Sequence, residues 1–331
     1  MGVAMLTRTE GPMEGWYNSN VLSSIGWTLE KVNPLFDLAS EYKRCIQQRI
    51  DVGAKTRLSC LTLFYEPSTR TRLSFESAAH KLGIKVLTVA DASNDSSARK
   101  GETLEDMGKL LGAYADVTII RHPELGAARR LSSTCSVPVI NAGDGAGEHP
   151  TQALVDLFTL REAFGTLKGL KVGLCGDLLN GRTIHSLLRL LCAFGCEVTA
   201  IAPPELGIPR EVLAKIPNSA EVKQSETDLR AVLPSLDVLY MTRIQKERFY
   251  DIDVYERVKH AYRLERADLE DASDHLRILH PLPRVDEVAP DVDQDSRALY
   301  FTQSANGVPV RMALLSAILG VQNRVHHGAQ Y

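Results

Sequence analysis

Short apolar runs alternate along the chain with longer segments whose apolar residues recur every three to four positions. The first kind of segment is typical of buried strands, and the second is typical of amphipathic helices. Strands are predicted at 60–65, 84–90, 116–121, 137–141, 170–175, 197–201, 236–243 and 277–284. Helices are predicted at 35–50, 68–82, 104–114, 153–164, 184–194 and 308–319. Because strands that alternate with helices form parallel sheets, the pattern predicts an α/β protein.

A hinge is predicted at 165–169, where a short segment bounded by two glycines precedes a repeat of the same pattern. The 331 residues are sufficient for two domains of ordinary size. Residues 300–304 begin with two aromatic side chains and predict either a late strand or a bridge. Residues 1–18 lack periodicity and predict a linker or a disordered lead-in.

Composition restricts the class of protein further. Hydrophobic residues make up 44% and charged residues 24% of the chain, as in globular proteins. The net charge of −3 provides no overall attraction to nucleic acid or to a membrane. No apolar run approaches the length of a membrane span, and the N-terminus lacks a signal-peptide pattern, so we expect a cytoplasmic protein. The six cysteines and nine histidines lack metal-ligand spacing, which predicts reduced thiols, no disulfides and no metal.

The end of the strand at 60–65 carries the densest candidate chemistry. A proline that closely follows this strand disfavours helix at the residue before it, so a turn begins there. Ser68 and Thr69 then lie where a helix N-cap is expected. A helix N-terminus has unpaired N–H groups and the positive end of the helix dipole, and Arg70 and Arg72 add charge to it. The combination predicts a phosphate site, and the alternative is an ordinary capped helix with surface arginines.

The start of the helix at 153–164 is a second candidate. His149, Pro150, Thr151 and Gln152 precede it, and proline suits a first helical turn because its missing N–H is not needed there. A histidine near a helix N-terminus is disfavoured as a cation, so we expect a neutral imidazole that can donate one hydrogen bond to a carbonyl oxygen. A simple capping role is the alternative.

Two further segments hold polar or rigid groups that could contact a ligand. Residues 91–102 are polar and lack periodicity, which predicts a surface loop; its Ser96 and Lys100 could contact an anion, although a solvated loop fits the chemistry alone. Near the end of the last predicted strand, prolines on both sides of Leu282 fix the backbone and allow a cis peptide bond. Such a turn can direct backbone carbonyl groups at a ligand.

Four arginines share one placement, because each lies where a predicted strand ends or the following helix begins. They are Arg70, Arg121, Arg182 and Arg243. Open α/β sheets bind ligands at the carboxyl ends of their strands, so these arginines predict a highly anionic set of ligands. The alternative is that the four arginines are simply solvated at the surface. This alternative explains the placement of any single arginine more readily than the shared placement of all four.

Several familiar kinds of catalytic site are excluded by the absence of their motifs. The glycines near 173–181 do not match the dinucleotide fingerprint, and the chain has neither a serine nucleophile elbow nor a P-loop. No paired catalytic carboxylates stand out. Positioning and electrostatic stabilisation remain, which suits transfer of a group from an activated phosphate.

Six motifs of the chain, in this order, resemble those of the aspartate carbamoyltransferase family. The motifs STRTR, RHP and HPTQ are similar to carbamoyl phosphate signatures and lie at 68–72, 121–123 and 149–152. The motifs DLLNGRT, TRIQ and HPLPR resemble aspartate carbamoyltransferases in particular and lie at 177–183, 242–245 and 280–284. The resemblance covers about residues 20–320 and is greatest to the form fused into the eukaryotic multifunctional pyrimidine-synthesis protein. It leaves open whether the chain is a fragment of such a fusion.

The resemblance implies a division of the chain into two doubly wound parallel-sheet domains, with the active site in the cleft between them. Residues 19–150 plus 305–322 would form a carbamoyl phosphate-binding domain, and residues 151–304 would form an aspartate-binding domain. Residues 1–18 would precede the domains as a lead-in, and residues 323–331 would form a tail.

The resemblance also implies a role for each matching residue. The residues expected to bind carbamoyl phosphate are Ser68, Thr69, Arg70, Thr71, Arg121, His149, Gln152, Leu282 and Pro283. Those among them expected to act in catalysis are Arg70, Thr71, Arg121 and His149. The residues expected to bind aspartate are Lys100, Arg182, Arg243 and Gln245. Ser96 and Lys100 would reach into the site of a neighbouring subunit, so the active unit would be a homotrimer.

The expected reaction is direct attack of the aspartate amine on carbamoyl phosphate, with no cofactor and no covalent enzyme intermediate. Ornithine carbamoyltransferase is the nearest alternative, but it has cysteine where this chain has Pro281, and the cationic side chain of ornithine would fit poorly beside Arg243. A catalytically silent scaffold domain and an NAD-dependent oxidoreductase are alternatives from other classes. The intact charged positions argue against the first, and the missing dinucleotide fingerprint argues against the second.

Overall fold

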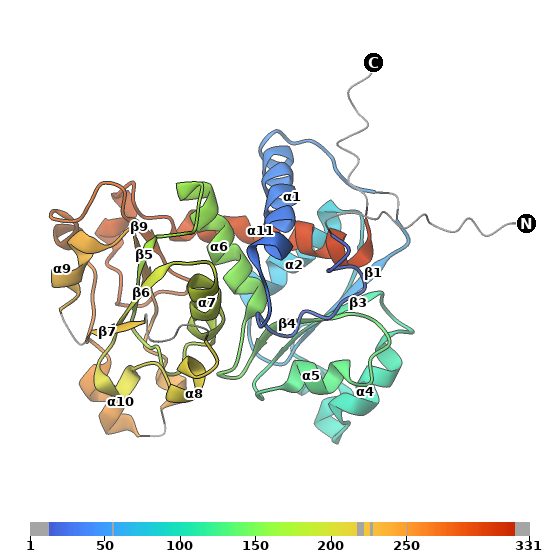
Figure 1. Cartoon of the computed structure of the whole chain (residues 1–331). Coiled ribbons are helices and arrows are strands. Elements are labelled where there is room, and N and C mark those ends of the chain that lie inside the picture. Colours follow the sequence, from blue (N-terminus) through green and yellow to red (C-terminus); the bar gives the residue numbers. More distant parts are fainter. Residues whose placement is uncertain (1–12, 55, 217–221, 226–227, 250, 322–331) are drawn as a thin grey trace, which may run out of the picture.

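The computed structural model describes residues 13–54, 56–216, 222–225, 228–249 and 251–321, and it contains two parallel β-sheets covered by helices (Figure 1). The first sheet has the strand order β2-β1-β3-β4, and the second has the order β7-β6-β5-β8-β9. Neighbouring strands in both sheets run parallel. The prediction of two parallel-sheet α/β units is therefore confirmed.

The strands of both sheets are short, and most of them are buried. Those of the first sheet are β1 (Ser59–Phe64), β2 (Lys85–Val89), β3 (Val117–His122) and β4 (Val139–Asp144). Those of the second sheet are β5 (Lys171–Cys175), β6 (Glu197–Ile201), β7 (Lys223–Ser225), β8 (Val238–Met241) and β9 (Arg277–Leu279). The eight strands predicted from apolar runs correspond to all of these except β7, a three-residue edge strand whose sequence has no apolar run.

The longer helices agree with the predicted helices, and several short ones were not predicted. The longer helices are α1 (Leu29–Gln47), α2 (Thr69–Lys81), α4 (Leu104–Leu111), α6 (Pro150–Phe164), α7 (Arg182–Ala193) and α11 (Tyr300–Leu319). The short helices are α3 (Ala92–Asp95), α5 (Ala127–Ser132), α8 (Arg210–Leu213), α9 (Leu229–Val232) and α10 (Ile252–Val258). Short helices have few turns, so their sequences show little periodicity.

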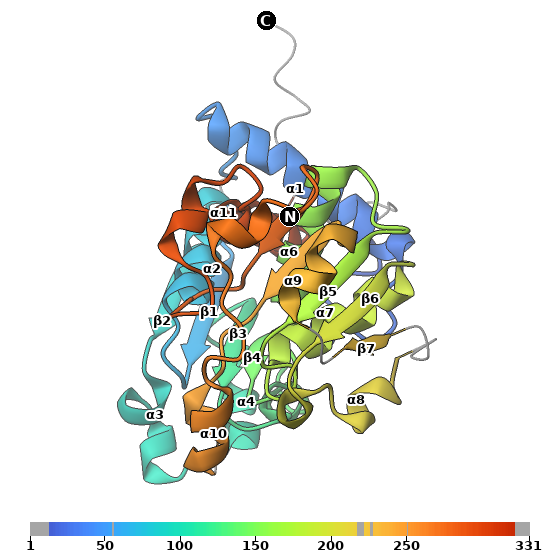
Figure 2. The ribbon, with the colours of Figure 1, turned by 90° about the vertical axis from the view of Figure 1, so that its left-hand side faces the viewer.

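Two helices join the halves of the molecule. Helix α6 leaves β4 of the first sheet and packs against α7 of the second unit, and α11 returns from the second unit to pack against α1, α2 and α6 (Figures 1 and 2). Phe158 of α6 and Val310 of α11 belong to one apolar core that continues from the first sheet into the second. The domain boundaries expected at 150 and 304 both lie inside these two helices.

Three segments differ from their predictions. The prediction of a strand or bridge at 300–304 is wrong, because these residues form the first turn of α11, where Tyr300 is fully buried. The expected lead-in is packed where the structure describes it: Trp16 is 1% exposed and contacts Trp27 edge to face at 5.3 Å, while residues 1–12 lie outside the described part. The loop at 91–102 contains α3 and a 3₁₀ turn, although it does lie on the surface. Across the described residues, we find no helix with the length and apolarity needed to cross a membrane.

Candidate active site

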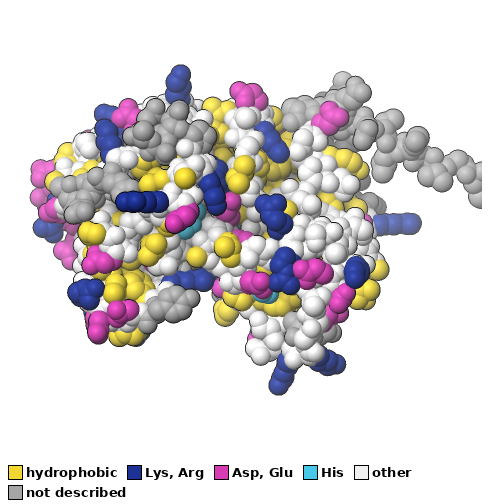
Figure 3. Space-filling view, turned by 60° about the horizontal axis from the view of Figure 1, so that its bottom comes forward, with side chains coloured by type: hydrophobic (Ala, Val, Ile, Leu, Met, Phe, Trp, Pro, Cys, Tyr) yellow, Lys and Arg dark blue, Asp and Glu magenta, His cyan; other side chains and the backbone are white. Residues whose placement is uncertain are grey.

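A cavity of about 720 Å³ lies where the carboxyl ends of strands from both sheets face each other. Figure 3 shows a face of the molecule that is notched between its two halves, with Lys and Arg side chains beside the notch. The cavity brings together most of the residues predicted from sequence. They are Ser68, Thr69, Arg70, Thr71, Arg121, His149, Gln152, Arg182, Arg243, Gln245, Leu282 and Pro283.

Two predicted site residues do not line this cavity. Ser96 follows α3, where its hydroxyl donates to the carbonyl oxygen of Ala92 at 2.5 Å. Lys100 ends the neighbouring 3₁₀ turn and is exposed. Both were expected to serve a neighbouring subunit, so their position outside this chain's own cavity does not contradict that expectation.

The N-terminus of α2 forms one wall of the cavity. Ser68 is its N-cap residue with extended backbone (φ −156°), yet its side chain makes no capping hydrogen bond. Instead, the Ser68 hydroxyl accepts a hydrogen bond from Arg121 Nη1 at 3.2 Å. The first turn of α2 contains no acidic residue, so the dipole of the helix is left to attract an external anion.

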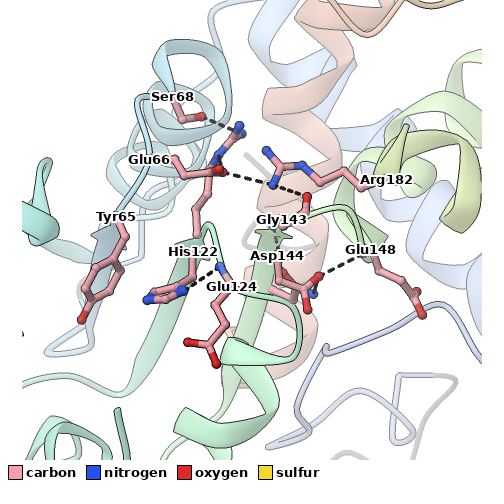
Figure 4. A network of polar contacts seen from close by, with 12 residues as sticks. Tyr65, Glu66, Ser68, His122, Glu124, Gly143, Asp144, Glu148 and Arg182 are labelled. Atoms are coloured by element: carbon pink, nitrogen blue, oxygen red, sulfur yellow. Dashed lines mark hydrogen bonds and ion pairs between the residues drawn. The ribbon is translucent and has the colours of Figure 1, made fainter. Parts of the chain in front are cut away.

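Glu66 lines the cavity and pairs with three arginines, of which Figure 4 labels Arg182. Its Oε2 lies 3.2 Å from Arg121 Nε and 3.1 Å from Arg182 Nη1, and its Oε1 lies 3.6 Å from Arg248 Nη2. Burial opposes ionisation of this carboxyl, but the nearby Arg182 and Arg121 outweigh it and lower its pKa. Burial and the charge of Arg182 lower the pKa of Arg121 to about 10, which leaves the guanidinium protonated at neutral pH.

His149 caps α6 deep in the cavity and is only 4% exposed. Its backbone N–H donates to Ser186 Oγ at 2.9 Å, which fixes the start of the helix. Burial, followed by the charges of Arg182 and Arg121, lowers the pKa of the imidazole well below its ordinary value. The neutral imidazole expected from the sequence is therefore supported, and burial and neighbouring cations are the causes that lower its pKa.

The turn after β9 closes another side of the cavity. The Leu282–Pro283 peptide bond is cis, as the sequence allowed, and Leu282 has φ of 56°. His280 Nδ1 accepts from the backbone N–H of Leu282 at 2.8 Å, so its Nε2 carries the hydrogen that is donated to Glu287 Oε1 at 2.7 Å. This buried pair holds the turn against the cavity.

The second sheet contributes the remaining cations. Arg182 begins α7, and Arg243 follows β8. Gln245 is held by the loop after β5: its backbone N–H donates to Asp177 Oδ2 and its Nε2 to the carbonyl oxygen of Asn180, each at 3.3 Å. The carboxyl ends of β5 and β8 thus present cationic and amide groups to the cavity.

Several cavity residues were missed by sequence reasoning. They are Glu66, Arg248, His280, Gln303 and Arg311. Arg311 offered a signal, since it is a charged residue within the otherwise apolar segment that became α11, and it is 3% exposed. No signal in the sequence indicated that Arg248 belongs to the site, because Arg248 lies in a short 3₁₀ turn whose position depends on tertiary packing.

Within the described part of the chain, no group of three or more His, Cys, Asp or Glu residues could hold a metal ion. The cavity instead gathers guanidinium, hydroxyl, amide and imidazole groups, all of which can bind and polarise anionic substrates without a covalent intermediate.

Two family models match almost the whole of the chain. Residues 19–162 match the model described as the carbamoyl-P binding domain of aspartate/ornithine carbamoyltransferase. Residues 168–318 match the Asp/Orn binding domain of the same family.

Similar proteins carry the same description. The aspartate carbamoyltransferase catalytic subunit of Thermococcus onnurineus is 44% identical over 306 residues, which cover 92% of this chain and 98% of that protein. The corresponding subunit of Methanopyrus kandleri is 46% identical over 312 residues, covering 93% and 99%. None of these archaeal relatives is described as a fused protein, so the greater resemblance to the fused eukaryotic form stays a prediction.

Solved structures are also similar over most of the chain. The aspartate transcarbamoylase of Trypanosoma cruzi in complex with carbamoyl phosphate and aspartate is 35% identical, with a TM-score of 0.88 and coverage of 93% of this chain and 99% of that one. Its ligand-free form is 32% identical, with a TM-score of 0.82 and the same coverage.

Proposed function

Since the chain belongs to the aspartate carbamoyltransferase family and is an enzyme of that family, we propose that it transfers the carbamoyl group of carbamoyl phosphate to the amine of L-aspartate. The products are N-carbamoyl-L-aspartate and phosphate. The reaction is an early step of de novo pyrimidine synthesis, and it takes place in the cytoplasm. The observation that carries the proposal is that one cavity joins the α2 N-terminus and His149 with arginines from both sheets.

Carbamoyl phosphate binds with its phosphate at the start of α2. Ser68, Thr69, Arg70 and Thr71 supply hydroxyl groups, a guanidinium and unpaired backbone N–H groups at this helix end. Gln152 and the turn at Leu282 contact the amino end of the carbamoyl group. These separate roles in binding the phosphate and the amino group are supported by the placement of the two groups of residues on different walls of the same cavity.

The oxyanion that develops on the carbamoyl oxygen is stabilised by Arg121, His149 and Thr71. Neutral His149 donates a hydrogen bond without adding a charge, and Arg121 remains cationic. One such donor is worth about 3 kcal/mol of transition-state stabilisation in a preorganised site.

Aspartate binds through its two carboxylates to Arg182, Arg243 and Gln245. The lone pair of its neutral amine forms a bond to the carbamoyl carbon, and the bond from that carbon to the phosphate oxygen breaks. The amine's proton leaves with phosphate, so no protein nucleophile is needed. Arg182 is already paired with Glu66, which belongs to the other half of the molecule, and binding of aspartate therefore couples to closure of the two halves.

We also propose a homotrimer in which Ser96 and Lys100 complete the site of a neighbouring subunit. Their position outside the chain's own cavity supports this arrangement. Strand β2 is an edge strand, and Leu87 on it is 43% exposed, while Leu73 on the preceding helix α2 is 50% exposed. Exposed apolar residues beside a free sheet edge are typical of a surface that another chain covers.

An assay of carbamoyl transfer to aspartate and to ornithine tests the proposed function. Carbamoylation of aspartate is expected, and Arg70→Ala is expected to abolish it while the protein stays folded. Arg72→Ala is the matched control, because Arg72 lies outside the cavity and pairs with Glu76 at 3.3 Å. Transfer to ornithine alone would contradict the assigned substrate, and transfer to neither amine would favour a silent scaffold domain.

A further inference from the structure

Asp156 is a carboxylate that the proposed mechanism does not use. It is fully buried on α6, four residues after Gln152. Its Oδ1 accepts from Gln152 Nε2 at 2.8 Å and from Gln303 Nε2 at 2.7 Å, and its Oδ2 accepts from the Tyr240 hydroxyl at 2.9 Å. These three donors come from α6, α11 and β8, so the carboxylate lies at the junction of the two halves.

An ionised carboxylate can only accept hydrogen bonds, so it determines which way each neighbouring amide faces. Both glutamines turn their NH₂ groups toward Asp156 and their carbonyl oxygens away from it. The oxygen of Gln303 accepts from the backbone N–H of His280 at 2.8 Å. Gln152 and Gln303 line the cavity while Asp156 lies behind them, so the carbonyl oxygen of Gln152 is left for a ligand.

We propose that Asp156 is a positioning residue that makes the cavity wall at Gln152 a hydrogen-bond acceptor and thereby selects a ligand bearing an –NH₂ group. The inference rests on the proposed function, because the selected group is the amino end of carbamoyl phosphate. Through Gln303 and His280, the same carboxylate also holds the start of the turn that carries Leu282. Gln152 and the turn at Leu282, which are proposed to contact the amino end of carbamoyl phosphate, therefore both depend on the buried charge of Asp156.

Two phosphonates that differ only at this group test the proposal. Phosphonoacetamide carries –NH₂ where 2-oxopropylphosphonate carries –CH₃, and inorganic phosphate lacks both groups. Calorimetric titration of the wild type is expected to show a preference for the amide of roughly tenfold, the value of one well-placed hydrogen bond. Inorganic phosphate reports on the α2 site alone and shows that a variant is folded.

Variants at position 156 should reduce this preference in steps. Asp156→Asn keeps the volume of the side chain but removes its charge, so its hold on Gln152 weakens and the preference falls. Asp156→Ala removes every acceptor, and the preference falls to roughly twofold or less. Binding of inorganic phosphate is expected to stay within roughly twofold of the wild type in both variants, because its contacts lie on α2.

Tyr240→Phe is the matched control. It removes one buried hydrogen bond to Oδ2 but leaves both glutamines on Oδ1, so the preference for the amide is expected to persist. Gln152→Leu should lose most of the preference, and adding Asp156→Asn to it should lower the remainder only as far as the turn at Leu282, held through Gln303, contributes to it.

The outcomes separate this inference from the proposed function. An unchanged preference in Asp156→Asn, with inorganic phosphate still bound, overturns the inference even when the wild type carbamoylates aspartate. An equal loss of preference in Tyr240→Phe also overturns it, since any disturbance of the core would then suffice. A wild type that does not carbamoylate aspartate contradicts the proposed function instead.

Discussion

At the scale of single residues, burial among cations gives His149 its properties. The imidazole lies beside Arg182 and Arg121, and its pKa is far below the ordinary value because the protonated form would add a third positive charge to a buried site. His149 therefore stays neutral at every pH at which the protein is expected to work. It can act as a hydrogen-bond donor but not as a titrating acid.

His149→Gln should lower kcat by about 100- to 1,000-fold through loss of an oxyanion donor. The variant should nevertheless keep the shape of the wild-type pH profile of kcat/KM between about pH 6.5 and 9, because wild-type His149 does not titrate in that range. Steady-state kinetics across this range checks the prediction. A limb near pH 6.5 that is present in the wild type and absent from the variant would contradict it.

Asp156 illustrates the opposite shift. Burial raises its pKa from 3.8 to about 6, although hydrogen bonds from Gln303, Gln152 and Tyr240 act against the rise. Between these two pH values the native protein holds a proton that the unfolded chain has lost. The stabilisation from this group is therefore fully present below about pH 4 and is lost as the pH rises through about 6.

Asp156→Asn should remove this pH dependence. We expect the difference in the free energy of unfolding, variant minus wild type, to rise by about 3 kcal/mol between pH 4 and pH 7. The reason is that one pKa unit corresponds to about 1.4 kcal/mol. Urea unfolding at fixed protein concentration measures the difference at both pH values. If the difference in the free energy of unfolding does not change with pH, the pKa of Asp156 is not raised in the folded state.

At the scale of elements, the loops after the strands carry the site residues, and these loops pack so closely that few substitutions fit between them. Gly176 follows β5 with φ of +117°, and a Cβ atom on it would lie 2.2 Å from the carbonyl oxygen of Thr242. Thr242 immediately precedes Arg243, which is proposed to bind aspartate. The close approach of these two loops therefore sets where Arg243 is held.

Gly176→Ala should destabilise the protein by about 3 kcal/mol or more, because backbone strain is added to a steric clash with a neighbouring backbone. It should also raise KM for aspartate more than KM for carbamoyl phosphate, since the displaced loop carries Arg243. Gly169→Ala is the control: φ is +81° there and nothing lies within 4 Å, so strain alone should cost about 1 kcal/mol. Equal effects of the two variants on KM would contradict the assignment.

Much of this arrangement of elements could be predicted from sequence. Pro67 keeps the chain out of helix just after β1 and Pro150 starts α6, both through local backbone chemistry that acts in any fold. The tertiary contacts of Glu66 could not be predicted in the same way, because its three arginines come from distant parts of the chain. Tyr300 was misassigned because its aromatic character suggested a strand, whereas its burial in an apolar cluster with strands β8 and β9 is compatible with a helix.

At the scale of the whole molecule, the proposed trimer shares its sites between subunits. Each site would take Arg70 from one chain and Lys100 from another. An Arg70 variant and a Lys100 variant would each have only defective sites as homotrimers, whereas a mixed trimer would contain one site in which both residues are wild type.

Mixing inactive Arg70→Ala and Lys100→Ala proteins under conditions of subunit exchange should therefore restore part of the activity. About one third of the wild-type activity is the most that such a mixed trimer can show, because at most one of its three sites has both wild-type residues. Activity assays before and after exchange check this prediction. Exchange without recovery would argue against shared sites, and a mixture of Arg70→Ala with wild type serves as the reference.

The apolar core that runs through α6 and α11 has a consequence for how the chain unfolds. The two sheets have separate topologies, but Phe158 and Val310 belong to a core that includes residues packed against both. Cutting the chain at 165–169 would leave each half with a large exposed apolar face, so neither half should fold alone. In topology the molecule has two domains, but because of this shared core we expect it to unfold as a single cooperative unit in one calorimetric transition.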